Sequence, residues 1–255
     1  MLIAARNAIL AGGAAPGPTP AYWGLCFTAE EPNCVVNMSK SGTPPAVTLE
    51  TSLDGVTWTS FDADGGTTPI TLAAVGDKVY FRAGSGGNSR LSLSGSSFRY
   101  FTLTGNTAAS GSIMSLLDAT NEGMDSLADC GSNTFCAMFF NCSSLTSAPS
   151  LPATVLKTGC YYGMFFGCSS LTSAPSLPAT VLVSNAYVRM FYRCSLLTEL
   201  RVAFPKWVTR ETNNWMTDVA ATGTFYCPTA LGTNATITRG TSACPEGWTV
   251  INTDA

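Results

Sequence analysis

Apolar and polar positions follow two different patterns along the chain, and the change falls near residue 105. Before it, short runs alternate apolar and polar residues, as in VTLETSL, with Val47 and Leu49, and in KVYFRA, with Val79 and Phe81. A period of two is typical of strands that turn one face to a core and the other to solvent. The pattern predicts eight strands, at residues 25–29, 34–40, 47–52, 57–61, 70–72, 78–83, 90–93 and 98–103.

Turn residues separate these runs, and the strongest turn signal is Asp54–Gly55, between LETSL and VTWTSF. This dipeptide favours a tight hairpin, in which both central residues need a positive φ. No helical pattern lies between the strands. Residues 22–105 are therefore predicted to form a small β-sandwich of immunoglobulin-like type, with Trp58 and Phe81 as core anchors.

A long repeat replaces the short alternation in the second half of the chain. Four methionines recur at intervals of 26 residues: Met138, Met164, Met190 and Met216. The string MFFNCSSLTSAPSLPATVL at 138–156 reappears at 164–182, and the two copies differ only where Asn141 becomes Gly167. A fixed period of this size is the signature of a solenoid, in which each unit stacks on its neighbours. Residues 106–255 are predicted to form one, with atypical units at both ends.

Within a unit, Met138, Cys142 and Leu145 are spaced as one stripe of a short helix, whereas Pro149 and Pro152 exclude a helix in SAPSLP. Nine residues are predicted to form the inward core of the units: Met138, Cys142, Leu145, Met164, Cys168, Leu171, Met190, Cys194 and Leu197. Three tryptophans are predicted to cover the last unit: Trp207, Trp215 and Trp248. The fold class expected is mainly β with short helices.

Residues 1–21 are predicted to form an anchor and linker. Arg6 and Asn7 interrupt the apolar run that a secretory signal would need, so a short helix ended by Gly12–Gly13 is favoured over a cleaved leader. Four apolar residues of this helix are predicted to dock on a partner: Leu2, Ile3, Ile9 and Leu10.

Charged residues make up only 11% of the chain, and the net charge is −3. A polar surface with little charge suits a secreted, fibrous or virion protein, and the absence of a basic face argues against nucleic-acid binding. No run of 18 apolar residues indicates a membrane span. The chain has no histidine, which removes the usual ways to activate a serine or cysteine nucleophile. No metal site or cofactor is predicted, and Asp62–Asp64 is interpreted as a turn because further calcium ligands are missing.

The chain has ten cysteines. Cys142, Cys168 and Cys194 occupy equivalent positions in successive units, so we expect a buried ladder of reduced thiols. Two other pairs, Cys26–Cys34 and Cys227–Cys244, are close in sequence and could form disulfides in an oxidising compartment.

The pattern MFxxCSSLTSAPxLPATVL, preceded by CYYG at 160–163, resembles the BspA-type (treponemal) leucine-rich repeats. The resemblance covers about residues 130–250, and the upstream β-rich stretch looks like the module that often precedes such repeats. It departs from the family pattern after Thr198, where Glu199–Arg201 replaces Ser-Ala-Pro. Proteins of this kind resemble surface adhesins of gut-type bacteria and virion or tail proteins of their phages, which implies binding to host proteins or glycans and no catalysis.

Two surfaces of the repeats are candidates for this binding; the alternative is a simple solvated face for the first and packing of many of its residues in the interior for the second. The first is a row of polar residues: Thr146, Ser147, Thr172, Ser173, Thr198 and Glu199. The second combines aromatic and basic residues: Tyr161, Tyr162, Tyr187, Tyr192, Arg189 and Arg193. Such residues are common interface anchors.

The first hypothesis is a non-enzymatic phage virion protein, such as a decoration, head-fibre or tail component. It would contact other virion proteins through its N-terminus, bind a host-surface protein or glycan through the repeats, and act as a homo-oligomer within the assembly. The second hypothesis is a bacterial cell-surface adhesin. A glycan-degrading enzyme is a third, less favoured hypothesis, because the few acidic residues mostly lie beside turn glycines.

Overall fold

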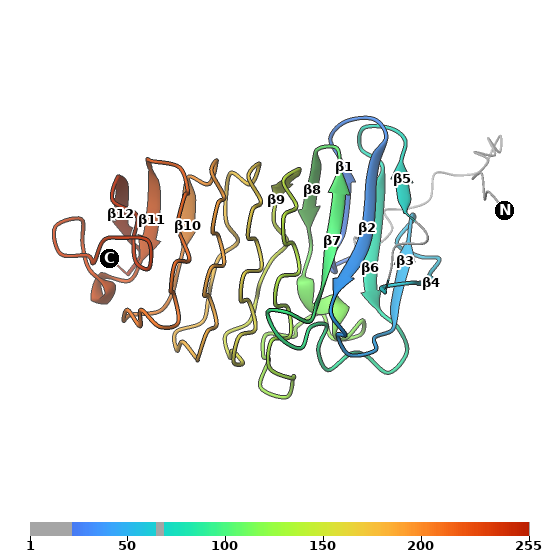
Figure 1. Cartoon of the computed structure of the whole chain (residues 1–255), viewed down its shortest axis with the longest axis horizontal. Coiled ribbons are helices and arrows are strands. Elements are labelled where there is room, and N and C mark those ends of the chain that lie inside the picture. The colour runs from blue at the N-terminus through green and yellow to red at the C-terminus, as the bar shows by residue number, and fades with distance from the viewer. Residues whose placement is uncertain (1–21, 65–68, 255) are drawn as a thin grey trace.

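The computed structural model describes residues 22–64 and 69–254, and the molecule is mainly β. A β-sandwich lies at one end and a stack of repeated layers extends from it to the C-terminal region (Figure 1). Within the described residues the only helices are two short 3₁₀ helices, η1 (Ile113–Leu116) and η2 (Thr229–Leu231). The predicted predominance of β structure is therefore confirmed.

Two sheets face each other in the sandwich. Their strands are β1 (Cys26–Ala29), β2 (Cys34–Ser41), β3 (Leu49–Ser52), β4 (Thr59–Phe61), β5 (Ile70–Leu72), β6 (Lys78–Ala83), β7 (Phe98–Thr104), β8 (Thr107–Ser110) and β9 (Leu145–Ser147). One sheet has the order β4-β3-β6-β1-β8-β9 and the other β5-β2-β7. β8 pairs antiparallel with β1 and parallel with β9. The sheet thus continues across residue 105 into the repeats.

The core between the sheets is aromatic. Phe81 packs edge-on against Phe27 and Phe101, with ring centroids 5.8 and 5.1 Å apart, and all three rings are fully buried. Alternate residues of β2 and β6 point into this core, as the period of two predicted. Buried aromatic pairs contribute about 0.5–1.5 kcal/mol each beyond their burial, so this cluster stabilises the contact between the sheets.

The sandwich differs from the sequence-based expectation in three places. Residues 90–93 form no strand, because the backbone N–H of Leu91 donates to Thr134 and not to a neighbouring strand of the sandwich. Trp58 is only half-buried, since it lies outside the core beneath the Arg82 guanidinium. β8, with the weak strand sequence TAAS, was not predicted.

The predicted hairpin between β3 and β4 forms, but its loop is longer than two residues. Gly55 has a positive φ of 74°, whereas Asp54 does not. The Asp54 carboxylate instead accepts hydrogen bonds from the backbone N–H groups of Val56 and Thr57, and these bonds hold the pKa of Asp54 far below its usual range. The aspartate therefore fixes the loop by capping its backbone.

In each layer of the repeats, which we call the repeat array (residues 133–218), left-handed backbone recurs at intervals of four residues within one short segment. The positions with positive φ are Asn133, Ala137, Asn141, Gly159, Gly163, Gly167, Asn185, Arg189, Arg193, Asn214 and Asp218. The one difference between the two near-identical strings, Asn141 against Gly167, falls at such a position. Glycine and asparagine adopt this conformation most readily, so the exchange preserves the backbone.

Backbone hydrogen bonds join successive layers of the array. The N–H of Phe139 donates to the carbonyl of Met164 at 2.8 Å, and the N–H of Phe165 donates to the carbonyl of Met190 at 2.9 Å. Residues between these donors bond within their own layer, as Phe140 does to Ala137. The predicted helical stripe is therefore wrong. A left-handed residue every four positions breaks a helix into successive turns, and the freed groups pair between layers.

The predicted core positions of the array face inward. Met138, Cys142 and Leu145 are buried, as are their equivalents in the next two layers. Each ladder thiol donates to a phenylalanine carbonyl of the preceding layer, as from Cys168 to Phe139 at 3.1 Å and from Cys194 to Phe165 at 3.0 Å. The thiols thereby satisfy buried acceptors as well as filling space.

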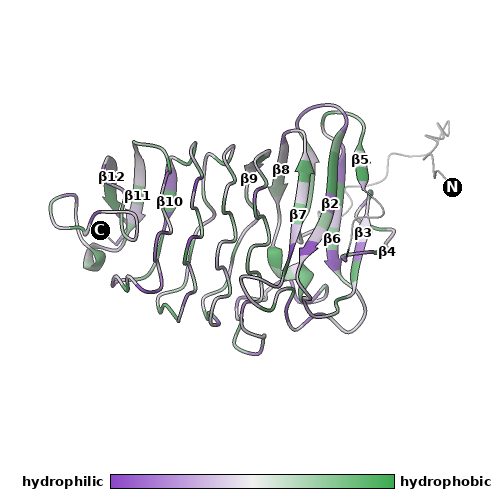
Figure 2. Ribbon diagram, in the orientation of Figure 1, coloured by the Kyte–Doolittle hydropathy of each residue, from purple (hydrophilic) through white to green (hydrophobic). Residues whose placement is uncertain are grey.

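A column of stacked rings runs along the interior from Phe101 of β7 through Phe139 and Phe165 to Phe191, with centroids 5.3–5.6 Å apart. One hydrophobic cluster extends from Leu25, just before β1, to Val250 in the last strand. Figure 2 shows apolar residues along the whole length of the ribbon. Sandwich and array therefore share one continuous core.

The far end is closed by a three-stranded parallel sheet, β10 (Glu199–Arg201), β11 (Gly223–Cys227) and β12 (Trp248–Asn252). Trp215 and Trp248 are buried there and Trp207 is half-buried against the same core, as the sequence predicted. The end of the stack is thus sealed by large aromatic side chains.

Two side chains cap the open edge of β12: Arg239 donates to the carbonyl of Trp248 at 2.7 Å, and Asn234 bonds both backbone groups of Val250. Asn234 accepts from the N–H of Val250 at 2.7 Å and donates to the carbonyl of Val250 at 3.2 Å. Loss of both bonds leaves a strand edge unpaired. We expect Asn234→Ala to lower the free energy of unfolding by about 1–3 kcal/mol in urea titrations. Thr238→Ala is the control, because the Thr238 side chain has no hydrogen-bond partner in the described ranges. Equal stability of the two variants would contradict the role of the cap.

Candidate functional site

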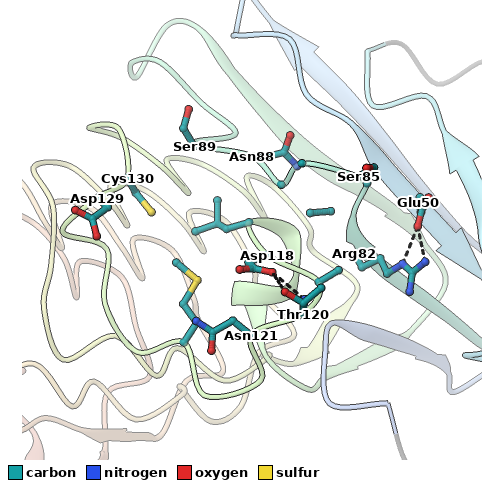
Figure 3. A pocket seen from close by; sticks show the side chains of 17 residues that line it. Glu50, Arg82, Ser85, Asn88, Ser89, Asp118, Thr120, Asn121, Asp129 and Cys130 are labelled. Atoms are coloured by element: carbon teal, nitrogen blue, oxygen red, sulfur yellow. Dashed lines mark hydrogen bonds and ion pairs between the residues drawn. The ribbon is translucent and has the colours of Figure 1, made fainter.

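A groove of about 820 Å³ opens beside the junction of the sandwich and the repeat array (Figure 3). The ends of β3 and β6 and the loop 84–89 supply one wall, and residues 117–124 with 129–130 supply the rest. The labelled side chains in Figure 3 surround this hollow, with Glu50 and Arg82 at one end and Asp129 and Cys130 at the other. Four separate segments of the chain therefore meet at one concave surface.

Arg82 is held in place on two sides. Its Nε donates to Oε2 of Glu50 at 2.7 Å, and its Nη2 lies 2.7 Å from the same oxygen. The guanidinium also lies over the Trp58 ring, 4.0 Å from the centroid. An arginine held by a carboxylate and an aromatic face loses little further entropy when it binds a ligand.

Asp118 is fixed in a similar way on the opposite wall. Its Oδ1 accepts from the backbone N–H of Thr120 at 2.8 Å and from the Thr120 hydroxyl at 2.7 Å. These bonds lower the pKa of Asp118, and the bond from the Thr120 hydroxyl has the larger effect. Asn88 pins the adjoining loop, because its amide bonds the backbone of both Thr48 and Leu116. The groove is thus built from side chains that are already ordered.

The predicted polar row lies along the strands of the array, but its members differ in exposure. Thr146 and Ser147 are half-buried, and the Ser147 hydroxyl donates to the carbonyl of Ala109. The others are exposed: Thr172, Ser173, Thr198 and Glu199. Ser173 bridges Glu199 of the next layer in parallel pairing. The structure therefore brings the last four of these residues together on one accessible face.

The second predicted patch separates into two groups. Tyr161 and Tyr187 are buried, because they stack between Phe135 and Trp215 in an internal column, so their prediction as surface residues is wrong. Burial raises the pKa of both phenols well above the usual value. The neighbouring Tyr192 is half-buried on the outer face.

Arg189 and Arg193 lie exposed on that outer face, in left-handed backbone with φ of 54° and 61°. Arg193 lies 5.5 Å from the centroid of the Tyr192 ring and 3.8 Å from the Asp218 carboxylate. An exposed ion pair of this kind contributes little to stability. The two arginines thus remain accessible to a partner.

All ten cysteines are buried and carry free thiols, including Cys26 and Cys34 and the pair Cys227 and Cys244. Burial raises the pKa of the ladder thiols, and it raises the pKa of Cys160 to about 12. Thiols that stay protonated react slowly. These side chains are therefore packing groups.

Two further observations concern the described part of the chain. It contains no cluster of three or more metal-binding side chains, and none of its helices is long and apolar enough to cross a membrane. The predicted anchor residues lie outside the described residues: Leu2, Ile3, Ile9 and Leu10.

No family model, curated protein or solved structure matches this chain. Its function must therefore be inferred from its own residues and geometry.

The groove was not found by sequence reasoning. Residues 84–87 hold three glycines, which by themselves indicate only a turn, and Asp118 stands in an ordinary polar stretch. Its lining comes from segments up to 80 residues apart, each of which resembles an ordinary polar loop. No local signal in the sequence indicates that they meet.

Proposed function

We propose that the protein is a non-enzymatic phage virion protein, a decoration, head-fibre or tail component, that displays a leucine-rich-repeat solenoid behind an immunoglobulin-like sandwich. Other virion proteins would hold its N-terminus, and the exposed face of the repeats would adhere to a host-surface protein or glycan. In a symmetric particle it would be present as a homo-oligomer.

The observation that carries this proposal is the single core that joins sandwich and array. A shared core couples the two parts rigidly, so the array can be held at a fixed distance from its attachment point. Between residues 131 and 188 the only charged residue is Lys157. A long, nearly uncharged surface favours contacts made by hydrogen bonds and shape over electrostatic steering.

The buried free thiols favour assembly in a reducing cytosol over export. Cys227 and Cys244 lie at the same end of the molecule, and neither forms a disulfide in the structure. Proteins built for an oxidising exterior commonly use such residues in disulfides. This observation supports the virion over the alternative, a bacterial cell-surface adhesin.

Antibodies raised against residues 133–218 test the display role. On intact particles from the source virus we expect labelling at regular positions on the outer surface, seen by electron microscopy. Labelling of the bacterial envelope in cells without particles would instead support the adhesin and refute the virion assignment.

A second arm of this experiment measures adhesion of the full chain to host bacteria. The double change Thr172→Arg and Ser173→Arg is expected to weaken binding by about fivefold or more, since it disrupts the accessible row. Thr180→Arg is the matched control, because Thr180 is exposed in the same layer but outside the row. Equal binding by both variants would remove the row from the proposal.

A further inference from the structure

We propose that the groove beside the sandwich binds a neutral saccharide. The inference rests on the proposed adhesive function and assigns its glycan ligand to a site outside the repeated residues. The volume of about 820 Å³ lies within the range of ligand pockets, roughly 300–1,000 Å³. It is large enough for one or two sugar rings.

The groove presents both hydrogen-bond donors and hydrogen-bond acceptors that bond no other side chain. The hydroxyls of Ser85 and Ser89 and the amide of Asn121 make no side-chain hydrogen bond to any described residue. Arg82 uses Nε and Nη2 on Glu50, which leaves the Nη1 donors. Hydroxyl and amide groups that can donate or accept match a polyhydroxylated ligand better than one with a single charged group.

The carboxylates of Asp118 and Asp129 supply hydrogen-bond acceptors on the opposite wall of the groove. Both hydrogen bonds from Thr120 reach Oδ1 of Asp118, so no side-chain donor occupies Oδ2. The Asp129 carboxylate has no ion-pair or hydrogen-bond partner within residues 22–64 and 69–254. A carboxylate can accept two hydroxyl protons, which suits the neighbouring hydroxyls of a sugar.

The charge of the groove selects against acidic sugars. Its lining contains three carboxylates and one guanidinium, and that guanidinium is already paired with Glu50. Asp118 and Asp129 therefore leave the groove negative. A sialic acid or a sulfated sugar would place a like charge beside them. A neutral saccharide meets no such repulsion.

The floor supplies the apolar contact that a sugar ring also needs. Leu117 is buried and Met124 is half-buried, and both line the groove next to Ala83 and Ala119. The C–H faces of a pyranose can pack on such side chains while its hydroxyls reach the polar walls. Because Arg82, Asp118 and Asn88 are already fixed by their own bonds, little ordering is needed on binding.

The test uses the full chain and a panel of immobilised oligosaccharides that includes lactose, cellobiose, maltose, chitobiose and 3′-sialyllactose. Neutral members are expected to bind and the sialylated one is not. For the best neutral probe, isothermal titration calorimetry is then repeated with Asp129→Ala and with Ser85→Trp, which fills the groove. Each change is expected to weaken binding by about tenfold or more.

Glu122→Ala is the matched control, because Glu122 lies in the same loop as Asn121 but does not line the groove. Its affinity is expected to stay unchanged, and circular dichroism of every variant checks that the fold is intact. The proposal is overturned if no neutral probe binds, if the sialylated probe binds best, or if folded Ser85→Trp binds as the parent does. Those outcomes leave particle labelling and adhesion through Thr172 and Ser173 untouched, so failure of the groove is distinct from failure of the display function.

Discussion

Met164→Asp is expected to unfold the repeat array at much lower denaturant concentration than the parent. Met164 is fully buried between two equivalent methionines, and a carboxylate there would have no cationic partner in the core. An uncompensated buried charge costs about 3–5 kcal/mol. Urea unfolding followed by tryptophan fluorescence measures the loss through Trp215 and Trp248, which lie at the far end of the same core.

Met164→Leu is the matched control for this change. The two side chains have similar volume, and such exchanges usually cost less than about 1.5 kcal/mol. Because sandwich and array share one cluster, we expect a single transition that moves as a whole. Equal midpoints for the aspartate and leucine variants would show that position 164 does not lie in a dry core.

Gly111→Ala is the second change with a large expected effect. Gly111 has φ of +71°, and an added Cβ would lie 1.8 Å from the carbonyl oxygen of Gly24. Gly24 and Gly111 lie where β1 begins and β8 ends, and their backbones are held by the pairing of these strands, so neither can move without disrupting the sheet. We expect a loss of about 3–5 kcal/mol, the range in which a core rearrangement is required.

Gly76→Ala separates the steric clash from the backbone conformation. Gly76 has a similar φ of +88°, but an added Cβ would meet no atom within 4 Å. Only the left-handed conformation is then penalised, by about 1–2 kcal/mol. Thermal unfolding of the two variants checks the difference, and a Gly111→Ala protein as stable as Gly76→Ala would show that β1 and β8 do not approach so closely.

The sequence predicted the inward positions of the array because they repeat. Burial of Met138, Cys142 and Leu145 followed from their recurrence at a fixed interval. The local backbone did not follow, since their spacing also fits a helix. The left-handed residues that break the helix include Ala137, Arg189 and Arg193, which are not the residue types that indicate a positive φ.

The same limit explains the misplaced tyrosines. Tyr161 and Tyr162 are adjacent and chemically identical, yet the first is buried and the second is half-buried. In the successive turns of this segment, Tyr161 joins the internal column whereas Tyr162 does not, so an error of one position exchanges core for surface. The groove was beyond prediction for a different reason, because Glu50 and Asp118 meet only when the loops of the sandwich close on η1.

Each layer accepts hydrogen bonds from the preceding layer and donates equivalent bonds to the following one. The bonds from Phe139 to Met164 and from Phe165 to Met190 are examples. Two successive layers are nearly identical in sequence over most of their length, at residues 138–156 and 164–182. Unequal recombination between the gene segments that encode them would insert or delete one whole layer of 26 residues while both ends kept their partners. The molecule can therefore gain or lose whole layers during evolution while the structures at its two ends stay the same.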